Sequence, residues 1–383
     1  ELTKRRRLLR QPLNIQSESA RVLITTEEAD MTDNRALIDL LSRLEKYAHF
    51  SLALLPTPIH PLQNLGASIG IPGLLIKRDD LTGLEGGGNK TRKLEYLVGD
   101  ALAVVADMLV TVGAIQSNHT RQTAAAAAKT GLKCSLLHCA WTKDASPQYR
   151  MVGNVLISHL TGADLYVEET ERPIEDQGPL EEFMAHLKEQ GHRPYLIPAG
   201  ASEHRLGCFG YIKCAAEIAV QMKDIGVEFD HIVHCTGSSS TQAGLLAGFA
   251  ALGVSAHVIG VSDDDETEIK KARVKKLAND ALQELDLDAR VSTQDVEVIS
   301  SNSNAYGVPD EDVVHATKLL ARKEGLVADP VYEGRAILGL LNLADKSRFE
   351  KNAKVLLMHL GGSPAIHAYA GRFGKIELEP FHA

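Results

Sequence analysis

The amino-acid sequence predicts an α/β fold in which helices cover both faces of parallel sheets. Short apolar segments with strand character alternate with helical segments from Met108 onward. Two of these strands run directly into loops rich in glycine, serine or threonine that open the next helix. Strands that alternate with helices are typical of parallel sheets, because each parallel connection needs a crossover long enough to hold a helix.

The first elements are separate from this alternation. Leucines at helical spacing predict a short helix between Asp33 and Tyr47, and Pro56 and Pro58 predict an extended turn. Leu74 to Lys77 is predicted to be a strand leading into a glycine-rich loop. The helix after that loop has one apolar face, made by Leu94, Leu97, Val98, Ala101, Leu102 and Val105.

The remaining elements follow in regular order. Helices are predicted from Asn118 to Lys129 and from Pro147 to Leu160. Strands are predicted at Met108 to Val112, Lys133 to His138, Asp164 to Val167, Pro194 to Ile197, His231 to His234, His257 to Val261 and Val355 to His359.

The composition excludes several classes of partner. The chain has 383 residues, 44% hydrophobic and 24% charged, as in an ordinary globular protein with a large core. A net charge of -9 argues against nucleic-acid binding, which needs a basic face. No apolar run approaches the roughly 20 residues of a transmembrane helix, so we expect no membrane partner. A small-molecule substrate fits this composition best.

The cysteines and the first thirty residues bear on the compartment. The five cysteines are odd in number and include no C-x-x-C pair, which favours reduced thiols in the cytoplasm. A basic cluster from Lys4 to Arg7 resembles organelle-targeting segments, whereas Glu27, Glu28 and Asp30 argue against that function. We expect residues 1–30 to form a disordered leader outside the fold.

The glycine-rich loop ends in the strongest candidate catalytic residue. Gly86, Gly87 and Gly88 remove every β-carbon from one approach, so that a planar ligand can lie against the backbone, and Lys90 opens the next helix. A lysine held in this way can condense with an aldehyde to form an imine. Neither a Walker loop nor a dinucleotide-binding fingerprint fits the spacing. A surface loop with a solvated lysine is the commoner structure, and this stretch alone favours it.

Two further loops follow strands and open helices, where free backbone amides attract anions. The first contains Ser117, Asn118 and His119, and its serine is either a plain helix cap or a residue that binds or attacks the substrate. His119 has no cysteine or carboxylate at ligand spacing, so we expect no metal. The second contains Ser238, Ser239, Ser240 and Thr241, whose hydroxyls and amides could surround a phosphate without a lysine.

Tyrosines stand in two short motifs near the C-terminus. Tyr306 lies in N-A-Y-G-V-P and Tyr332 in D-P-V-Y-E-G. A tyrosine is most often a core residue with a solvated hydroxyl, but beside a bound cofactor either residue could transfer a proton.

Together these stretches resemble the pyridoxal-phosphate enzymes of the tryptophan-synthase β type, known as fold type II. Within them the chain resembles the family of 1-aminocyclopropane-1-carboxylate deaminase and D-cysteine desulfhydrase. The resemblance runs from about Leu55 to Tyr369 through G-G-N-K-T-R-K-L-E-Y-L, I-Q-S-N-H-T-R-Q, S-T-Q-A-G, Y-G-V-P, D-P-V-Y-E-G and H-L-G-G, in that order. Six ordered motifs are far more specific than any one of them, and they favour the catalytic interpretation of Lys90.

The resemblance implies a domain arrangement. A larger cofactor-binding domain would comprise residues 47–92 and 204–383, with a smaller α/β domain, residues 93–203, inserted into it. Residues 1–46 would form an N-terminal extension. The resemblance also implies a homodimer.

The resemblance further implies roles for individual residues. Lys90 would hold pyridoxal 5'-phosphate as an imine, with Asn89 beside the ring hydroxyl and Glu333 at the pyridine nitrogen. The residues from Ser238 to Thr241 would surround the phosphate. The segment of Ser117, Asn118 and His119 would bind the substrate carboxylate, with Ser117 a candidate nucleophile. Tyr306 and Tyr332 would flank the reacting carbons, and Leu360 would contact the substrate.

One pair of residues separates the two activities of this family. The desulfhydrase branch tends to have serine or threonine after the V-Y tyrosine and threonine after the histidine of H-x-G-G, where this chain has Glu333 and Leu360. The pair therefore favours the cyclopropane deaminase. The G-L-E-G-G-G-N-K loop and the segment that ends in His119 resemble the desulfhydrase side, so D-cysteine desulfhydrase is the alternative. A catalytically silent cofactor-binding protein is disfavoured by the intact Lys90, Ser117 and tyrosines.

Overall fold

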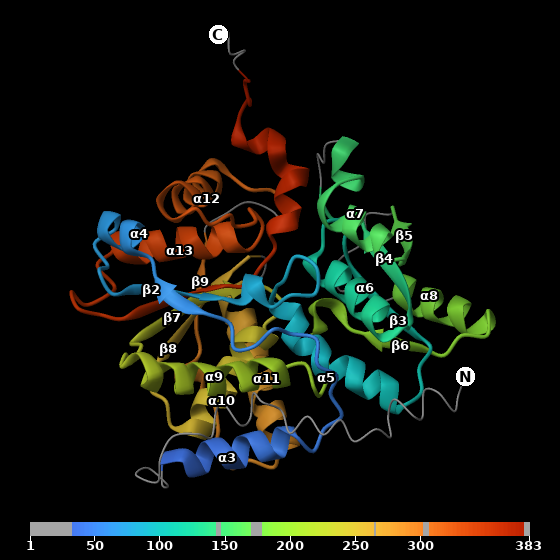
Figure 1. Ribbon diagram of the computed structural model, residues 1–383, viewed down its shortest axis with the longest axis horizontal. Helices are drawn as coiled ribbons and strands as arrows, with labels where there is room; N and C mark the ends of the chain where they lie inside the picture. The colour runs from blue at the N-terminus through green and yellow to red at the C-terminus, as the bar shows by residue number, and fades with distance from the viewer. Residues whose placement is uncertain (1–32, 143–146, 170–177, 264–265, 302–305, 379–383) are drawn as a thin grey trace.

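The computed structural model describes residues 33–378 apart from 143–146, 170–177, 264–265 and 302–305. Within these residues the chain forms two sheets flanked by helices (Figure 1), which confirms the predicted α/β class. The predicted leader, residues 1–30, lies outside the described residues.

The larger sheet has six strands in the order β1-β2-β10-β7-β8-β9. All neighbours are parallel except β1, which pairs antiparallel with β2 at one edge. Its strands are β1 (Ile59–Pro61), β2 (Leu74–Arg78), β7 (His231–Thr236), β8 (His257–Ser262), β9 (Glu297–Ser300) and β10 (Val355–His359).

The smaller sheet has four parallel strands in the order β5-β4-β3-β6. These strands are β3 (Met108–Ala114), β4 (Lys133–Cys139), β5 (Asp164–Glu168) and β6 (Pro194–Ile197). They lie within the predicted inserted segment, residues 93–203, while the exact domain boundaries stay a prediction.

Helices cover both faces of the larger sheet (Figure 1). On one face lie α4 (Gln63–Ser68), α12 (Glu311–Glu324) and α13 (Glu333–Asp345), which share a core with the sheet. On the other face lie α3 (Asp33–Leu44), α9 (Phe209–Ile225), α10 (Ser240–Leu252) and α11 (Thr267–Glu284). A parallel sheet needs such cover, because both of its faces are apolar.

The smaller sheet is also covered on both faces. One face packs on α6 (Asn118–Thr130), and α7 (Gly153–Leu160) packs against α6 in turn. The opposite face packs on α8 (Gly178–Glu189) through Phe183 and Leu187. Helix α5 (Asn89–Ala103) contributes Leu94 and Leu97 to the same cluster as α9 and α10, so one continuous core joins the two parts of the chain.

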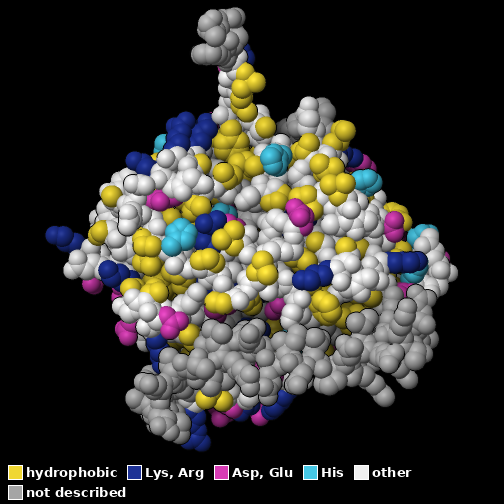
Figure 2. Space-filling view, in the orientation of Figure 1, with side chains coloured by type: hydrophobic (Ala, Val, Ile, Leu, Met, Phe, Trp, Pro, Cys, Tyr) yellow, Lys and Arg dark blue, Asp and Glu magenta, His cyan; other side chains and the backbone are white. Residues whose placement is uncertain are grey.

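Four short 3-10 turns and one longer 3-10 segment also belong to the described fold: η1 (Asp79–Leu81), η2 (Pro147–Arg150), η3 (Ala199–Ala201), η4 (Thr293–Asp295) and the longer η5 (Ser363–Phe373). Figure 2 shows basic and acidic side chains interspersed among apolar ones on the described part of one face. Among the described helices, none combines the length and the apolar character needed to cross a bilayer.

The structure corrects two predicted helices. The segment predicted as one helix from Pro147 to Leu160 is a short turn, η2, followed by α7, because Val152 adopts an extended conformation and Gly153 has a φ of +62°. Helix α5 ends at Ala103, so Val105 does not extend its apolar face. Val105 is 43% exposed and has a φ of +60°.

Candidate active site

The glycine-rich loop packs against the end of β10. The loop approaches η1 so closely that a β-carbon on Gly87 would lie 1.8 Å from the carbonyl oxygen of Asp80. Gly88 has a φ of +126°, which disfavours any other residue. The Asn89 N–H donates to the carbonyl of Leu360 over 2.8 Å. The loop therefore fixes the first turn of α5, where Lys90 lies, beside the H-L-G-G motif.

Lys90 has the electrostatic environment of a nucleophilic amine. Burial lowers the pKa of its amine to about 8, so a substantial fraction is neutral near physiological pH. Lys93 follows one helical turn later, and burial together with Lys90 holds its pKa well below the ordinary value. The Lys93 Nζ donates to Ser240 Oγ over 2.7 Å. The two amines of this helix therefore lie close enough to shift each other's pKa, and Lys93 also donates to the serine turn.

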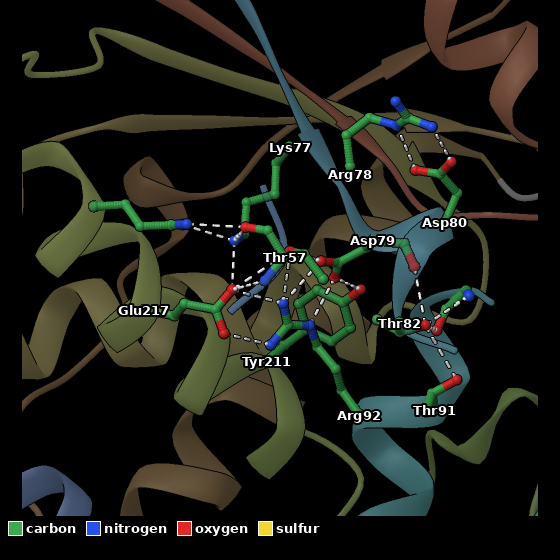
Figure 3. A network of polar contacts seen from close by, with 12 residues as sticks. Thr57, Lys77, Arg78, Asp79, Asp80, Thr82, Thr91, Arg92, Tyr211 and Glu217 are labelled. Carbon is green, nitrogen blue, oxygen red and sulfur yellow. Dashed lines mark hydrogen bonds and ion pairs between the residues drawn. The ribbon is translucent and has the colours of Figure 1, made fainter. Parts of the chain in front are cut away.

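A buried network anchors the start of α5 to the rest of the molecule (Figure 3). Arg92 is 1% exposed and donates to the carboxylates of Asp79 and Glu217 at 2.8 to 3.0 Å. Lys77 of β2 lies 2.5 Å from Glu217, and the hydroxyl of Tyr211 donates to Asp79 over 2.7 Å. These contacts join β2, η1, α5 and α9. They meet at Arg92, which follows Lys90 by two positions in α5.

The turn before α10 forms a small polar cradle. Ser239 has a φ of +70° and is 2% exposed, and its hydroxyl has no recorded partner among the described residues. Ser240 contacts Ser202 of the loop after η3, with 2.8 Å between the two Oγ atoms. The Asn89 side-chain amide donates to Thr241 Oγ1 over 3.2 Å. The first turn of α5 and the start of α10 therefore face one another.

Side-chain hydrogen bonds hold the turn before α6 in place. Ser117 is the N-cap, and its Oγ accepts the N–H groups of His119 and Thr120. These contacts use oxygen lone pairs and leave the hydroxyl proton able to donate. The Asn118 Oδ1 accepts from Asn154 over 2.9 Å, so its NH₂ group is turned the other way. A β-carbon on Gly362 would lie 2.7 Å from this nitrogen, which places Asn118 at the H-L-G-G motif.

His119 lies below this turn. Its Nε2 is 2.7 Å from the hydroxyl of Thr111 on β3, and it is 3% exposed. Burial and the two nearby lysines hold its pKa well below the ordinary value, so the ring is neutral. A nearby cavity is lined by Asn118, Tyr306 and Tyr332 but not by His119. The contact between His119 and Thr111 instead indicates that this histidine supports the turn.

The two predicted tyrosines meet in that cavity. Their hydroxyl oxygens lie 2.5 Å apart, so Tyr306 and Tyr332 share one hydrogen bond. Burial and the contact with Tyr306 raise the pKa of Tyr332 well above its ordinary value. The cavity is lined by Ala114, Gln116, Asn118, Tyr149, Tyr306, Gly307, Asp329, Val331, Tyr332, Ala365 and Tyr369.

Buried carboxyl groups lie at the start of α13. Asp329 accepts the N–H groups of Val331, Tyr332 and Glu333 over 2.8 to 3.2 Å, which orients the tyrosine and the glutamate that follow it. Glu333 is 3% exposed and accepts a backbone hydrogen bond from Leu360. Burial and the nearby Asp329 hold the pKa of Glu333 well above its ordinary value.

Predicted residues from distant parts of the sequence therefore come together around the glycine loop. Asn89 is hydrogen-bonded to Thr241 and Leu360, and Asn118 lies near Gly362 of the same H-L-G-G motif as Leu360. Sequence reasoning gave no role to Ser202, Asp329, Tyr149 and Tyr369, and it considered Lys93 only as the rival of Lys90 for the cofactor. Lys93 follows Lys90 by three positions in a helix and so shares its face, which is a signal that the sequence does contain.

This set of groups fits pyridoxal 5'-phosphate. The cradle offers hydroxyls, a helix N-terminus, the Lys93 amine beside Ser240 and the buried Ser239 hydroxyl to a phosphate. Lys90 offers an amine to an aldehyde, and Glu333 offers a buried acid to a ring nitrogen. When bound, this cofactor withdraws electrons from the carbon that carries the substrate amine. In the described residues, no cluster of three or more His, Cys, Asp or Glu side chains is arranged to hold a metal ion.

Comparisons with known proteins agree with this chemistry. Residues 50–361 match the model of the pyridoxal-phosphate dependent enzyme family. The chain is 43% identical over 333 residues to the 1-aminocyclopropane-1-carboxylate deaminase of Bradyrhizobium diazoefficiens, with 86% of this chain and 99% of that protein covered. It is 42% identical to the enzyme of the same name from Burkholderia ambifaria, with 86% of this chain and 98% of that protein covered.

A solved structure described as an ACC deaminase homologue is also similar. It aligns with a TM-score of 0.79 and 34% sequence identity, covering 88% of this chain and 98% of the other. These matches span both sheets and confirm the expected enzyme class, fold type II and cofactor, pyridoxal 5'-phosphate. The chain belongs to the pyridoxal-phosphate dependent enzymes and, within them, to the family of 1-aminocyclopropane-1-carboxylate deaminase and D-cysteine desulfhydrase.

Proposed function

We propose that this enzyme opens 1-aminocyclopropane-1-carboxylate and releases 2-oxobutanoate and ammonia. The observation that carries the proposal is the buried pair of Glu333 and Leu360. Glu333 is held at the start of α13 by the Asp329 turn, and the backbone N–H of Leu360 is directed at its carboxyl group. Leu360 is itself 7% exposed and presents no hydroxyl.

The chemistry of the substrate explains why this pair matters. A cyclopropane amino acid has no α-hydrogen, so its ring must open with electrons moving into the cofactor. A protonated pyridine ring accepts those electrons best, and a carboxylate such as that of Glu333 facing the ring nitrogen would stabilise the proton on that nitrogen. Elimination from D-cysteine requires only loss of the α-proton and departure of sulfide, so it depends less on that proton.

The other residues take the remaining roles in this proposal. Lys90 would hold the cofactor, and the segment from Ser238 to Thr241 would bind its phosphate. Ser117 and Asn118 would bind the substrate carboxylate through the hydroxyl proton and the NH₂ group described above. Tyr306 and Tyr332 would exchange protons with the substrate, because their shared hydrogen bond lets one hydroxyl supply a proton while the other accepts one.

D-cysteine desulfhydrase remains the second candidate. It is favoured by the G-L-E-G-G-G-N-K loop and by the segment that ends in His119. In that case the same pocket would release pyruvate, hydrogen sulfide and ammonia. Both substrates are small amino acids, and each has a carboxylate that Ser117 and Asn118 would bind.

The test compares 2-oxo-acid formation from the cyclopropane substrate, D-cysteine and L-cysteine. The purified parent enzyme should produce 2-oxobutanoate from the cyclopropane substrate. The double variant Glu333→Ser/Leu360→Thr should lose about tenfold to several-hundredfold of that rate, the usual effect of removing an interaction that strengthens in the transition state. Hydrogen sulfide release from D-cysteine should be unchanged or higher.

Three outcomes separate the candidates. A parent that forms only pyruvate and sulfide from D-cysteine would replace the deaminase by the desulfhydrase. A double variant with the parent's substrate ranking would show that Glu333 and Leu360 do not determine which substrate is preferred. A cofactor-loaded protein that turns over none of the three substrates would support a silent cofactor-binding protein.

A further inference from the structure

A second pair of tyrosines borders the same cavity. Tyr149 belongs to η2 and Tyr369 to η5, and they are 3% and 6% exposed. Their rings pack edge to face with centroids 5.7 Å apart, and their hydroxyl oxygens lie 3.3 Å apart. Both tyrosines line the cavity together with Tyr306 and Tyr332. We call Tyr149 and Tyr369 the tyrosine clasp.

Each clasp hydroxyl donates a hydrogen bond to a group outside the pair. Tyr369 donates to the carbonyl of Gly307 over 2.9 Å, and Tyr149 donates to Thr142 Oγ1 over 3.1 Å. Each hydroxyl has a single proton, so neither can also donate to a substrate while these bonds hold. The hydroxyl oxygens of Tyr306 and Tyr332 lie closer together, 2.5 Å apart, and share one hydrogen bond.

Gly307 follows Tyr306 directly and is held from two sides. It has a φ of +73°, and a β-carbon there would lie 2.5 Å from Thr142 Oγ1. Thr142 comes from the segment after β4, whereas Tyr369 comes from the C-terminal part of the chain. The preceding Trp141 packs edge to face on the Tyr306 ring, with centroids 6.4 Å apart. Contacts from both parts of the chain therefore fix the backbone that carries Tyr306.

We propose that Tyr369, supported by Tyr149, is a positioning residue that holds the Gly307 carbonyl and thereby keeps the Tyr306 hydroxyl against Tyr332. The inference rests on the proposed function, in which the latter two tyrosines exchange protons with the substrate. The clasp acts through the backbone and transfers no proton itself. Loss of the Tyr369 hydroxyl leaves the Gly307 carbonyl without that donor and lets the Tyr306 segment move.

The proposal separates the clasp from the residues that perform chemistry. Tyr369→Phe should lower kcat about tenfold, because Tyr306 occupies its productive position less often. It should leave the shape of the pH profile unchanged, since the clasp transfers no proton. It should also leave the dissociation constant of the cofactor unchanged, since the clasp does not belong to the serine turn that would bind the phosphate. Tyr149→Phe should have a smaller effect in the same direction. The double variant should be no more than about twofold worse than Tyr369→Phe, because the two hydroxyls belong to one network.

The experiment uses the holoenzyme and the variants Tyr369→Phe, Tyr149→Phe and the double variant. The matched control is Tyr47→Phe, which removes a hydroxyl that donates to the carbonyl of Glu284 over 2.6 Å near α3. Hydrogen exchange by mass spectrometry is followed in peptides covering residues 306–313. Exchange there should become several-fold faster in Tyr369→Phe and remain at the parent rate in the control. Kinetics with the cyclopropane substrate and D-cysteine follow on the same samples.

Each result decides for or against the clasp. Unchanged exchange at residues 306–313 in Tyr369→Phe would overturn the positioning role, as would an unchanged kcat. A shift of the alkaline limb of the pH profile in Tyr369→Phe would make Tyr369 a proton donor and would equally overturn it. A parent enzyme inactive on both substrates would refute the proposed function alone, because the exchange measurement needs no substrate.

Discussion

Lys90 and Lys93 show how the surroundings of a residue, rather than its type, determine its role. Both amines have lowered pKa values and lie one helical turn apart. Lys93 donates to Ser240, and its Nζ lies 5.8 Å from the centroid of the Tyr211 ring. Lys93 is thus engaged by the serine turn, while the lowered pKa of Lys90, about 8, leaves part of its amine neutral for covalent chemistry.

This difference predicts which lysine carries the cofactor. Lys90→Ala should lose more than about a thousandfold in turnover, the scale on which covalent catalytic groups act. The absorbance of the covalently bound cofactor should disappear as well. Borohydride reduction of the parent followed by peptide mapping should place the label on Lys90. A label on Lys93 would contradict the assignment.

Ser239 combines strain with an unused hydroxyl. A non-glycine residue with a φ of +70° costs about 1 kcal/mol, and the buried hydroxyl has no recorded partner in the described part of the chain. We expect Ser239→Gly to leave the cofactor-free protein at least as stable as the parent while weakening cofactor binding about tenfold to a hundredfold, since hydrogen bonds to charged groups contribute about 1.5–3 kcal/mol. Isothermal titration and urea unfolding measure the two effects.

A matched variant separates strain from hydrogen bonding at this position. Ser239→Ala removes the hydroxyl but keeps a β-carbon, so it should weaken cofactor binding equally without relieving the strain. Equal cofactor affinity in the parent and both variants would show that the hydroxyl does not bind the phosphate.

At the scale of elements, the sequence predicted strands and helices better than their contacts. The strand from Val355 to His359 is predicted with its observed limits, because a run of mostly apolar residues ends shortly before two glycines. The three-residue strand β1 and the strand β9 were missed, since each is short and alternates little. Periodicity also could not show that Arg92 and Lys77 are buried, because their partners Asp79 and Glu217 are far apart in the sequence.

The network around Arg92 predicts how stability depends on pH. Arg92 and Lys77 hold the pKa of Glu217 at about 2, below its ordinary value of 4.5. A carboxyl group with a lowered pKa in the folded state stabilises the fold above about pH 4.5 and loses this contribution as the pH falls toward 2. The shift corresponds to about 3 kcal/mol at neutral pH.

Glu217→Gln should therefore lower the free energy of unfolding by about 3–5 kcal/mol at pH 7, because Arg92 and Lys77 keep buried charges without this partner. The difference from the parent should narrow between pH 4.5 and pH 3. Urea unfolding at several pH values measures both effects. Glu169→Gln is the control, since its ion pair with Arg150 is about half exposed and should matter little. A difference that stays constant with pH would contradict the assigned pKa.

At the scale of the whole molecule, the sequence shows the order of the motifs but not which of their residues come into contact in the folded chain. The six motifs predicted the family, which the comparisons confirmed. The contacts that build the pocket join Asn89 to Leu360, Asn118 to Asn154 and Tyr369 to Gly307, and no local pattern encodes such pairs. The predicted homodimer and the domain boundaries at residues 93 and 203 stay predictions.

Because the groups that fit the cofactor come from α5, α10 and α13, the cofactor should stabilise the molecule as a whole. Ligand that binds only the folded state adds about 2.7 kcal/mol at one hundred times its dissociation constant. Removing pyridoxal 5'-phosphate should therefore lower Tm by several degrees, and adding it back should restore the original value. Hydrogen exchange should rise in peptides covering residues 86–93 and 237–243, which lie far apart in the sequence.

Pyridoxal without phosphate distinguishes the two ends of the site. It can still react with Lys90 but leaves the cradle of Ser239 and Ser240 empty, so it should restore only part of the Tm and protect residues 86–93 more than 237–243. Lys90→Ala with the intact cofactor should show the reverse pattern, because the phosphate can still bind at the start of α10. Equal protection of both segments by pyridoxal alone would mean that the serine turn is ordered through α5 and not by the phosphate.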